Sequence, residues 1–291
     1  MRTLVLIAAS MRPRQWTKNL FVAAALLFSG NLFDAALAVR TALAVLVFCV
    51  ASGAVYLFND ILDRQRDRSH PRKSRRPIAS GKLPAAAAAA VAAVLAALAL
   101  AGGAALGWPF ALAVAVYLAI QAAYCTVLRN VVILDAFALA AGFVARVVAG
   151  AVAIDVQISS WLLVCTTLIA LFLALCKRRQ ELSSLAGDAA RHRQVLAEYS
   201  EYLLDQMIVV AASATLVAYA LYTMAEATIA KFGSSNLIFT LPFVIYGLFR
   251  YLFLVHRRDE GGRPEQTLIT DPPLLIDVLL WALAAGAIVY R

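Results

Sequence analysis

Long apolar segments alternate with short polar ones along most of this 291-residue chain. Most of the segments reach the ~20 residues that an α-helix needs to cross a bilayer. Nine can be counted: Asn19–Leu37, Thr41–Leu62, Pro84–Ala104, Trp108–Leu128, Val132–Ile154, Ser160–Cys176, Tyr202–Ala227, Asn236–Val255 and Pro272–Tyr290. The first is the least regular, because Ser29-Gly30-Asn31 and Asp34 interrupt it. The pattern predicts an all-α integral membrane protein with nine transmembrane helices.

The composition excludes a soluble protein. Hydrophobic residues make up 63% of the chain and charged residues 15%, and the mean hydropathy is +0.81. No soluble domain of this length has such a composition. The four cysteines lie in apolar segments without CxxC spacing, which argues against a disulfide framework or a zinc site. At the amino terminus Arg12, Arg14 and Lys18 directly follow a short apolar run, so we do not interpret that run as a signal peptide.

The basic residues indicate the orientation of the chain. With the amino terminus in the cytoplasm, only Arg40, Lys231 and Arg291 of the 26 Lys and Arg residues fall outside, and Arg146 and Arg250 lie within spans. The positive-inside rule therefore predicts a multi-pass protein of the inner (cytoplasmic) cell membrane, with the amino terminus inside and the carboxyl terminus outside. The formal charge of +9 is thus expected at the membrane surface, and no nucleic-acid partner is expected.

The larger polar loops all fall on the predicted cytoplasmic face. They are residues 64–83, 177–201 and 256–271, and we expect them to belong to a single domain that includes the whole chain, residues 1–291. A transporter would need access from both faces and broken helices in matching halves, and no such pair is visible. We therefore expect chemistry at the cytoplasmic surface.

Three aspartates mark the end of the second span. If that helix continues, Asp60, Asp63 and Asp67 lie at i, i+3 and i+7 on one face, with Asn59 at their head. Three carboxylates in register repel one another unless a divalent cation bridges them, and oxygen ligands suit Mg2+. The alternative is a solvated, salt-bridged helix end beyond a membrane span.

Cationic side chains, some close to these aspartates in the sequence and some at other predicted span ends, could bind phosphate oxygens. The candidates are Lys18, Arg72, Arg75, Arg76, Lys177 and Arg178. For Lys177 and Arg178 the alternative is a membrane anchor at a helix end.

Two further charges lie within the fifth span. Asp135 and Arg146 are eleven residues apart, close to three turns, so both point the same way roughly 16 Å apart along the axis. A charge inside a span is costly and often functional, although Arg146 could equally form a buried structural pair.

The pattern NDxxDxxxD at Asn59–Asp67 resembles the first aspartate motif of the UbiA family of intramembrane prenyltransferases. The resemblance implies a UbiA-like helical bundle, an active site at the cytoplasmic face and Mg2+ as cofactor. It also implies a second motif, DxxxD, that holds another Mg2+. Asp135 matches its first position, but Leu139 stands at the second, which argues against ordinary prenyl-diphosphate chemistry.

Six further blocks are similar to a narrower branch of that family: Arg12–Asn19, Asp67–Gly81, Gly142–Ala151, Lys177–Leu182, Tyr199–Met207 and Pro264–Asp271. This branch transfers a 5-phosphoribosyl group from phosphoribosyl pyrophosphate to a polyprenyl (decaprenyl-type) phosphate and releases pyrophosphate. The resemblance implies a role in arabinofuranose donor and cell-envelope synthesis, and a homo-oligomer is compatible with it. On this hypothesis Asp60, Asp63 and Asp67 bind Mg2+ and are catalytic, and the lipid phosphate lies near Lys18 or Arg146. Asn59 and Asp135 are expected to contact substrate.

Two alternatives remain open at this point. One is a Mg2+-dependent prenyltransferase that moves a prenyl chain from a prenyl diphosphate to an aromatic acceptor. Leu139 and the extra cations at 177–179 count against it. The other is a non-enzymatic transporter or lipid-binding scaffold, which only the number of spans supports.

Overall fold

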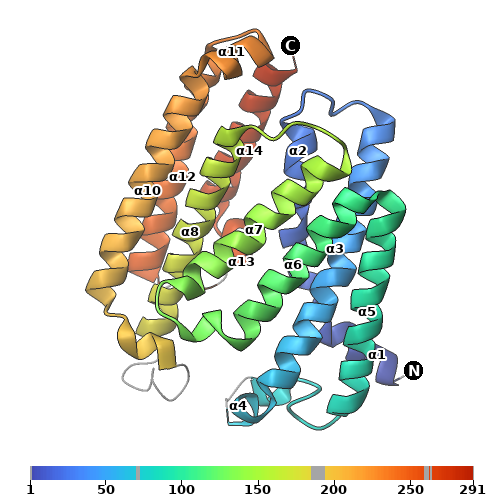
Figure 1. Ribbon diagram of the computed structural model, residues 1–291. Helices are drawn as coiled ribbons and strands as arrows, with labels where there is room; N and C mark the ends of the chain where they lie inside the picture. The colour runs from blue at the N-terminus through green and yellow to red at the C-terminus, as the bar shows by residue number, and fades with distance from the viewer. Residues whose placement is uncertain (1, 70–72, 185–193, 259–261, 263, 291) are drawn as a thin grey trace. The chain divides into compact units, whose positions relative to one another are not determined.

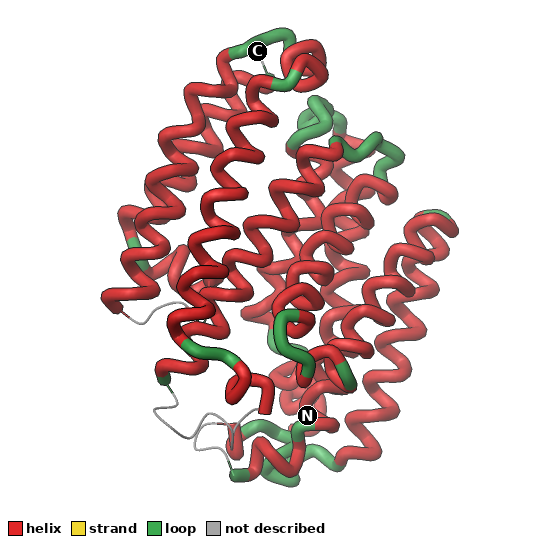
Figure 2. Tube along the Cα trace, turned by 60° about the vertical axis from the view of Figure 1, so that its left-hand side comes forward, coloured by secondary structure: helices red, strands yellow, loops and turns green. Residues whose placement is uncertain are grey.

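A computed structural model of the chain describes residues 2–69, 73–184, 194–258, 262 and 264–290. Arg72 lies outside these residues, as do parts of the three predicted cytoplasmic loops. Within the described part, helices and turns account for the regular structure and no strand occurs (Figure 2). The prediction of an all-α protein is therefore confirmed.

Eight helices in the described residues are long and apolar enough to cross a membrane. They correspond to the second to ninth predicted spans and include α3 (Ala35–Leu62), α5 (Ala85–Leu106), α6 (Trp108–Thr126), α7 (Leu134–Ala153), α8 (Ser160–Ser183), α10 (Glu201–Met224), α12 (Leu241–Arg258) and α14 (Pro272–Val289). These helices confirm a multi-pass membrane protein.

The first predicted span is not one continuous helix. A 3-10 helix, η1 (Pro13–Ala23), is followed by the short α2 (Ala24–Leu27) and then by a turn that ends where α3 begins. Gly30 has φ 86°, a left-handed conformation that a helix cannot include. The Asp34 side chain accepts hydrogen bonds from the amides of Ala36 and Leu37 and so caps α3. The polar residues that interrupt this segment in the sequence are thus the residues that end one helix and start the next.

The chain forms two compact units. Unit 1 contains Met1–Arg129 and Gly142–Gln157, and unit 2 contains Asn130–Ala141 and Ile158–Arg291. Helix α7 contributes its first residues to unit 2 and the rest to unit 1.

In unit 1, α3 packs against α5, α6 and η1 around buried Phe48, Phe110 and Tyr117. Three short helices complete the described part of this unit: α1 (Arg2–Ser10), α4 (Arg64–Arg68) and η2 (Lys73–Arg75), with η3 (Leu128–Asn130) at its edge. Near the start of α3, the Arg40 guanidinium donates to the carbonyls of Leu106 and Ala153, at the ends of α5 and α7. One side chain thus satisfies terminal carbonyls of two helices.

In unit 2, α8 packs against α10, and α12 packs against α14 (Figure 1). The buried core of this unit includes Phe172, Leu204 and Leu254. Among the described residues of this unit, four short helices connect the long ones: η4 (Gln194–Glu198), α11 (Glu226–Phe232), η5 (Asn236–Thr240) and α13 (Pro264–Thr270).

Charged side chains join three helix ends within unit 2. Arg179 near the end of α8 and His256 near the end of α12 both contact Asp205 in the first turns of α10, at 3.1 Å each. These three ends therefore lie together, as alternating antiparallel spans require.

Gly150 on α7 tests how closely this helix approaches η1. A Cβ added there would overlap the carbonyl oxygen of Val22, whereas a Cβ added at Gly286 on α14 would meet nothing within 4 Å. We expect Gly150→Ala to destabilise the protein by about 1–3 kcal/mol, because backbone would have to move, and Gly286→Ala to cause no loss. Thermal unfolding of the two variants in detergent measures the difference. Equal melting temperatures would contradict the described packing.

Candidate active site

The three predicted aspartates pair with three arginines in unit 1, Asp60 and Asp67 through the shared Arg76, and Asp63 through Arg129. We call Asp60, Asp63, Asp67, Arg12, Arg76 and Arg129 the acid–arginine cluster. Helix α3 ends at Leu62 and α4 begins at Arg64, so the aspartates are not on one unbroken helix as expected. The Asp67 amide still donates to the Asp63 carbonyl at 2.8 Å, which keeps a helical turn across the junction.

Arg76 connects two of the aspartates. Its Nη1 lies 3.1 Å from Asp60 Oδ1 and 2.6 Å from Asp67 Oδ2. Both aspartates are only 2% exposed. Since they touch the same nitrogen, their two oxygens can be no farther apart than the sum of these distances. The turn after η2 thus positions the Arg76 guanidinium between two buried carboxylates.

Arg12 adds a second cation to Asp60. It forms an ion pair with Asp60 Oδ1, and its guanidinium carbon lies 5.0 Å from the centre of the Tyr56 ring, a cation–π contact. Arg12 has φ 52°, a left-handed conformation that is uncommon for residues other than glycine. This conformation precedes η1 and brings the amino-terminal segment to the end of α3.

Asp63 has a separate set of partners. Arg129 Nη1 lies 2.8 Å from its Oδ1, and the Asn59 side chain donates to its Oδ2 at 3.1 Å. Arg66 is more distant, at 3.8 Å. Asn59, predicted at the head of the motif, therefore orients one of the acids.

The donor atoms of the cluster suit a hard divalent cation. In the described part of the chain no three Asp, Glu, His or Cys side chains converge closely enough to form a metal site as they stand. Asp60 and Asp67 nevertheless converge on one cationic nitrogen of Arg76. Arg76 thus places a positive charge between the two carboxylates, and carboxylate oxygens are the ligands that Mg2+ prefers. The residues therefore fit Mg2+, and their role as its ligands remains a prediction.

The other predicted phosphate-binding residues differ in accessibility. Arg75 is exposed, and Lys18 on η1 and Lys177 on α8 are half-buried. Arg178 is 0% exposed, forms an ion pair with Asp135 at 2.8 Å and also pairs with Glu181. A guanidinium in that position is not accessible to a substrate phosphate.

Arg146 lies in the interior of unit 1. It donates to Asn19 Oδ1 at 2.9 Å, to Gly142 O at 2.7 Å and to Tyr117 Oη at 2.9 Å. Asn19 in turn donates to Ser52 Oγ at 3.1 Å. These bonds join α7 to η1, α6 and α3. Asp135 and Arg146 both lie on α7, and each has its own partners within its own unit.

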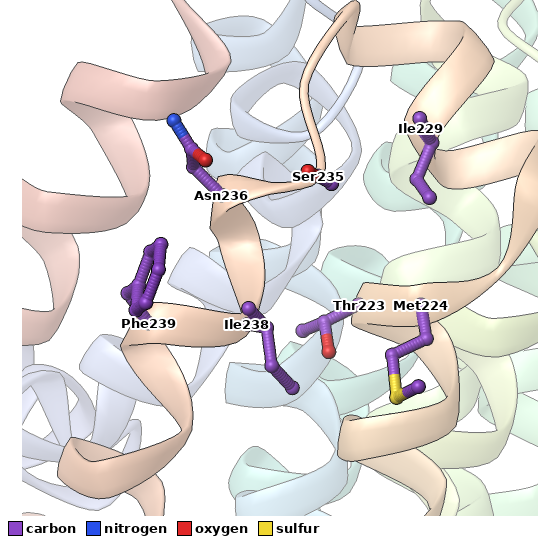
Figure 3. Close-up of a pocket in the computed structure, with 7 residues that line it drawn as sticks. All are labelled: Thr223, Met224, Ile229, Ser235, Asn236, Ile238 and Phe239. Atoms are coloured by element: carbon purple, nitrogen blue, oxygen red, sulfur yellow. The ribbon is translucent and has the colours of Figure 1, made fainter.

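A hollow of about 350 Å3 lies in unit 2 at the end of α10 (Figure 3). Its lining is Thr223, Met224, Ile229, Ser235, Asn236, Ile238 and Phe239. It is mainly apolar and contains none of the predicted site residues, so we do not assign the chemistry to it.

Arg12 and Arg129 are not among the site residues predicted from the sequence. Their partners lie 48 and 66 residues away in the chain. Nothing in a single sequence signals such a pairing.

Comparison with known proteins gives a consistent result. A sequence model described as the UbiA prenyltransferase family matches residues 19–269. A protein of Mycolicibacterium smegmatis named decaprenyl-phosphate phosphoribosyltransferase is 35% identical, over 97% of this chain and 91% of that protein. A protein of the same name from Corynebacterium glutamicum is 34% identical, over 97% and 86%.

Solved structures support the same fold. The structure of a UbiA homolog from Archaeoglobus fulgidus bound to GPP and Mg2+ matches with a TM-score of 0.73 and 19% sequence identity. The match covers 98% of this chain and 100% of that one. At this identity the likeness supports the fold alone.

Replacing Arg76 tests whether it substitutes for a metal cation. We expect Arg76→Gln to lower the melting temperature by several degrees in EDTA, because Asp60 and Asp67 would repel each other without it. Mg2+ should raise the melting temperature of this variant more than that of the unchanged protein, since binding to the native state is stabilising. The matched control is Arg75→Gln, an exposed neighbour, which should show neither effect. An identical response to Mg2+ in all three proteins would contradict the metal site.

Proposed function

Because the chain belongs to the UbiA prenyltransferase family, we propose that it transfers a 5-phosphoribosyl group from phosphoribosyl pyrophosphate to a polyprenyl phosphate of the decaprenyl type. Two relatives aligned over nearly the whole chain bear the name decaprenyl-phosphate phosphoribosyltransferase, at 35% and 34% identity. The chain is thus a transferase of this family, and the donor, the acceptor and a place in arabinofuranose donor synthesis for the cell envelope are our proposal.

The acid–arginine cluster is the observation that carries this proposal. Phosphoribosyl pyrophosphate brings a pyrophosphate that binds Mg2+ and a separate 5-phosphate, so its site needs both acidic and cationic groups. The cluster supplies three carboxylates and three guanidiniums in unit 1. An arginine fork matches the geometry of phosphate oxygens.

We propose that Asp60, Asp63 and Asp67 hold Mg2+, Asp67 either directly or through water. Bound there, the metal would offset the negative charge of the pyrophosphate oxygens. Arg76 is 26% exposed and lies on a turn, so its side chain can move from the carboxylates to a pyrophosphate oxygen. Arg12 and Arg129 are further candidates for the same role.

The reaction exchanges one C–O bond for another. The bond between ribose C1 and the pyrophosphate oxygen breaks, and its electron pair leaves with the pyrophosphate. A phosphate oxygen of the lipid forms the new bond to C1. A phosphate monoester is largely ionised at neutral pH, since its second pKa is about 6, so no strong general base is required. Positioning and charge stabilisation by the cluster would supply most of the rate.

Other cations complete our assignment of phosphate-binding residues. Lys18 and Lys177 are half-buried, and Arg75 is exposed. We propose Lys177 and Lys18 as phosphate-binding residues of their respective units. Arg178 is buried and we remove it from direct substrate binding.

We also propose a ninth crossing, with the amino terminus in the cytoplasm and the chemistry at the cytoplasmic face of the inner membrane. A 3-10 helix rises about 2.0 Å per residue and an α-helix 1.5 Å, so η1 and α2 together would extend about 28 Å. That is close to the ~30 Å of the hydrocarbon core. The basic loops support this orientation.

The second candidate is transfer of a prenyl chain to an aromatic acceptor. The family name favours it. Leu139 counts against it, because this residue packs against the apolar core of unit 2 and no acid replaces it on that turn.

The direct test uses purified protein in detergent with Mg2+, a polyprenyl phosphate and phosphoribosyl pyrophosphate labelled in the ribose. We expect label in the lipid phase and none when Mg2+ is removed with EDTA. An absence of labelled lipid, together with turnover of a prenyl diphosphate and an aromatic acceptor, would refute the proposal in favour of the second candidate.

A pair of matched variants tests the carboxylates. Asp60→Asn should reduce phosphoribosyl transfer by at least about a hundredfold, the scale of losing one principal electrostatic group. The control is Asp34→Asn, which lies at the other end of the same helix and keeps a good cap, so transfer should be unchanged. Comparable activity of the two variants would rule out the metal-binding role of Asp60.

A further inference from the structure

Asp135 contacts two side chains of its own unit, Tyr199 and Arg178. It lies in the first turn of α7 and is 0% exposed. The Tyr199 hydroxyl donates to Asp135 Oδ1 at 2.7 Å, and Arg178 Nε forms an ion pair with Oδ2 at 2.8 Å. Oδ1 therefore accepts a hydrogen bond, whereas Oδ2 faces the guanidinium at ion-pair distance without hydrogen-bond geometry.

Tyr199 also binds the backbone of Ile133, two residues before Asp135. Its hydroxyl accepts a hydrogen bond from the Ile133 amide at 2.6 Å. Ile133 is β-branched and has φ 69°, a conformation that such residues rarely adopt and that costs energy to maintain. Burial, followed by the hydrogen bond to Asp135, raises the pKa of the Tyr199 phenol, so the hydroxyl keeps its proton and can donate. One hydroxyl thus fixes both the strained residue and the carboxylate.

Burial distinguishes this ion pair from that of Arg76. Arg76 is partly exposed on a turn and can move away from its carboxylates, whereas Arg178 is 0% exposed and lies on the long helix α8. Moving its guanidinium away would leave Asp135 buried without a counter-charge, which is strongly unfavourable. A divalent ion at Asp135 would also face that fixed positive charge.

We infer that Asp135 is a positioning residue and not a metal ligand, and that with Tyr199 and Arg178 it locks the inner ends of α7 and α8 and the start of α10. The lock sets the end of α8, where Lys177 precedes Arg178, so the position of this half-buried cation, which we propose as a phosphate-binding residue, depends on the lock. This inference rests on the proposed function for the identity of that phosphate. It removes Asp135 from the direct substrate contacts expected from the sequence.

The first test counts metal ions. Mn2+ bound per protein is measured by electron paramagnetic resonance in the presence of inorganic pyrophosphate, for the full chain and for Asp135→Asn and Asp60→Asn. We expect Asp135→Asn to keep the number of bound ions, with affinity reduced by no more than about tenfold, and Asp60→Asn to lose at least one, because a direct ligand holds the ion whereas an outer group changes mainly its affinity. Loss of one ion in Asp135→Asn would overturn the inference. If Asp60→Asn kept all its bound ions, the proposed metal site would be contradicted. The ion count of Asp135→Asn would still show whether Asp135 is a metal ligand.

A second test uses the coupling between the charges. Asp135→Asn should lower the melting temperature by several degrees, because Arg178 loses its counter-charge, and the double variant Asp135→Leu/Arg178→Met should recover most of the loss. If Asp135→Asn does not fold, the ion count is made on this double variant, with the same expectation. Additive losses in the double variant would refute the coupling.

Kinetics separate positioning from a purely structural or a catalytic role. Asp135→Asn should raise KM for phosphoribosyl pyrophosphate by about tenfold with kcat little changed, since a displaced α8 end weakens ground-state and transition-state binding alike. Tyr199→Phe should shift KM in the same direction. A large fall in kcat with unchanged KM, or no kinetic change, would contradict the inference.

Discussion

Mutual repulsion between buried carboxylates is the constraint on which the candidate site depends. Asp60 and Asp67 are almost fully buried and face the same point, and the chain keeps them there by bringing Arg76 between them. Arg12 pairs with the same Oδ1 of Asp60 that Arg76 contacts, and Arg129 pairs with Oδ1 of Asp63. The same arginines that balance these charges are the ones that we propose to bind phosphate beside the proposed metal ligands. Under this proposal, local stability and the binding of an anionic substrate depend on the same ion pairs.

Each unit contains a buried aspartate paired with an arginine, but the two arginines differ in their exposure to solvent. In unit 1 the arginine is partly exposed and borne by a turn, so the pair can open. In unit 2 the Arg178 guanidinium is fully buried, lies on the long helix α8 and forms an ion pair with Asp135. A buried pair of this kind adds little net stability but strongly penalises loss of either partner. We therefore assign chemistry to the first pair and positioning to the second.

The apolar pattern was sufficient to predict eight helices, because a span depends mainly on segment length and hydropathy. The first segment departed from the expectation through local effects: Gly30 adopts φ 86°, and Asp34 caps α3. The acids of the site were predicted from their spacing. Arg12 and Arg129 could not be assigned, because their partners are 48 and 66 residues away and only tertiary packing brings them together.

A structure of the protein with Mg2+ and phosphoribosyl pyrophosphate tests the central claim most directly. We predict that Asp60 holds the metal and that the Arg76 guanidinium leaves Asp60 and Asp67 to contact pyrophosphate oxygens. A complex in which Arg76 still bridges the two carboxylates, with the donor bound away from them, would contradict the proposed metal and phosphate site.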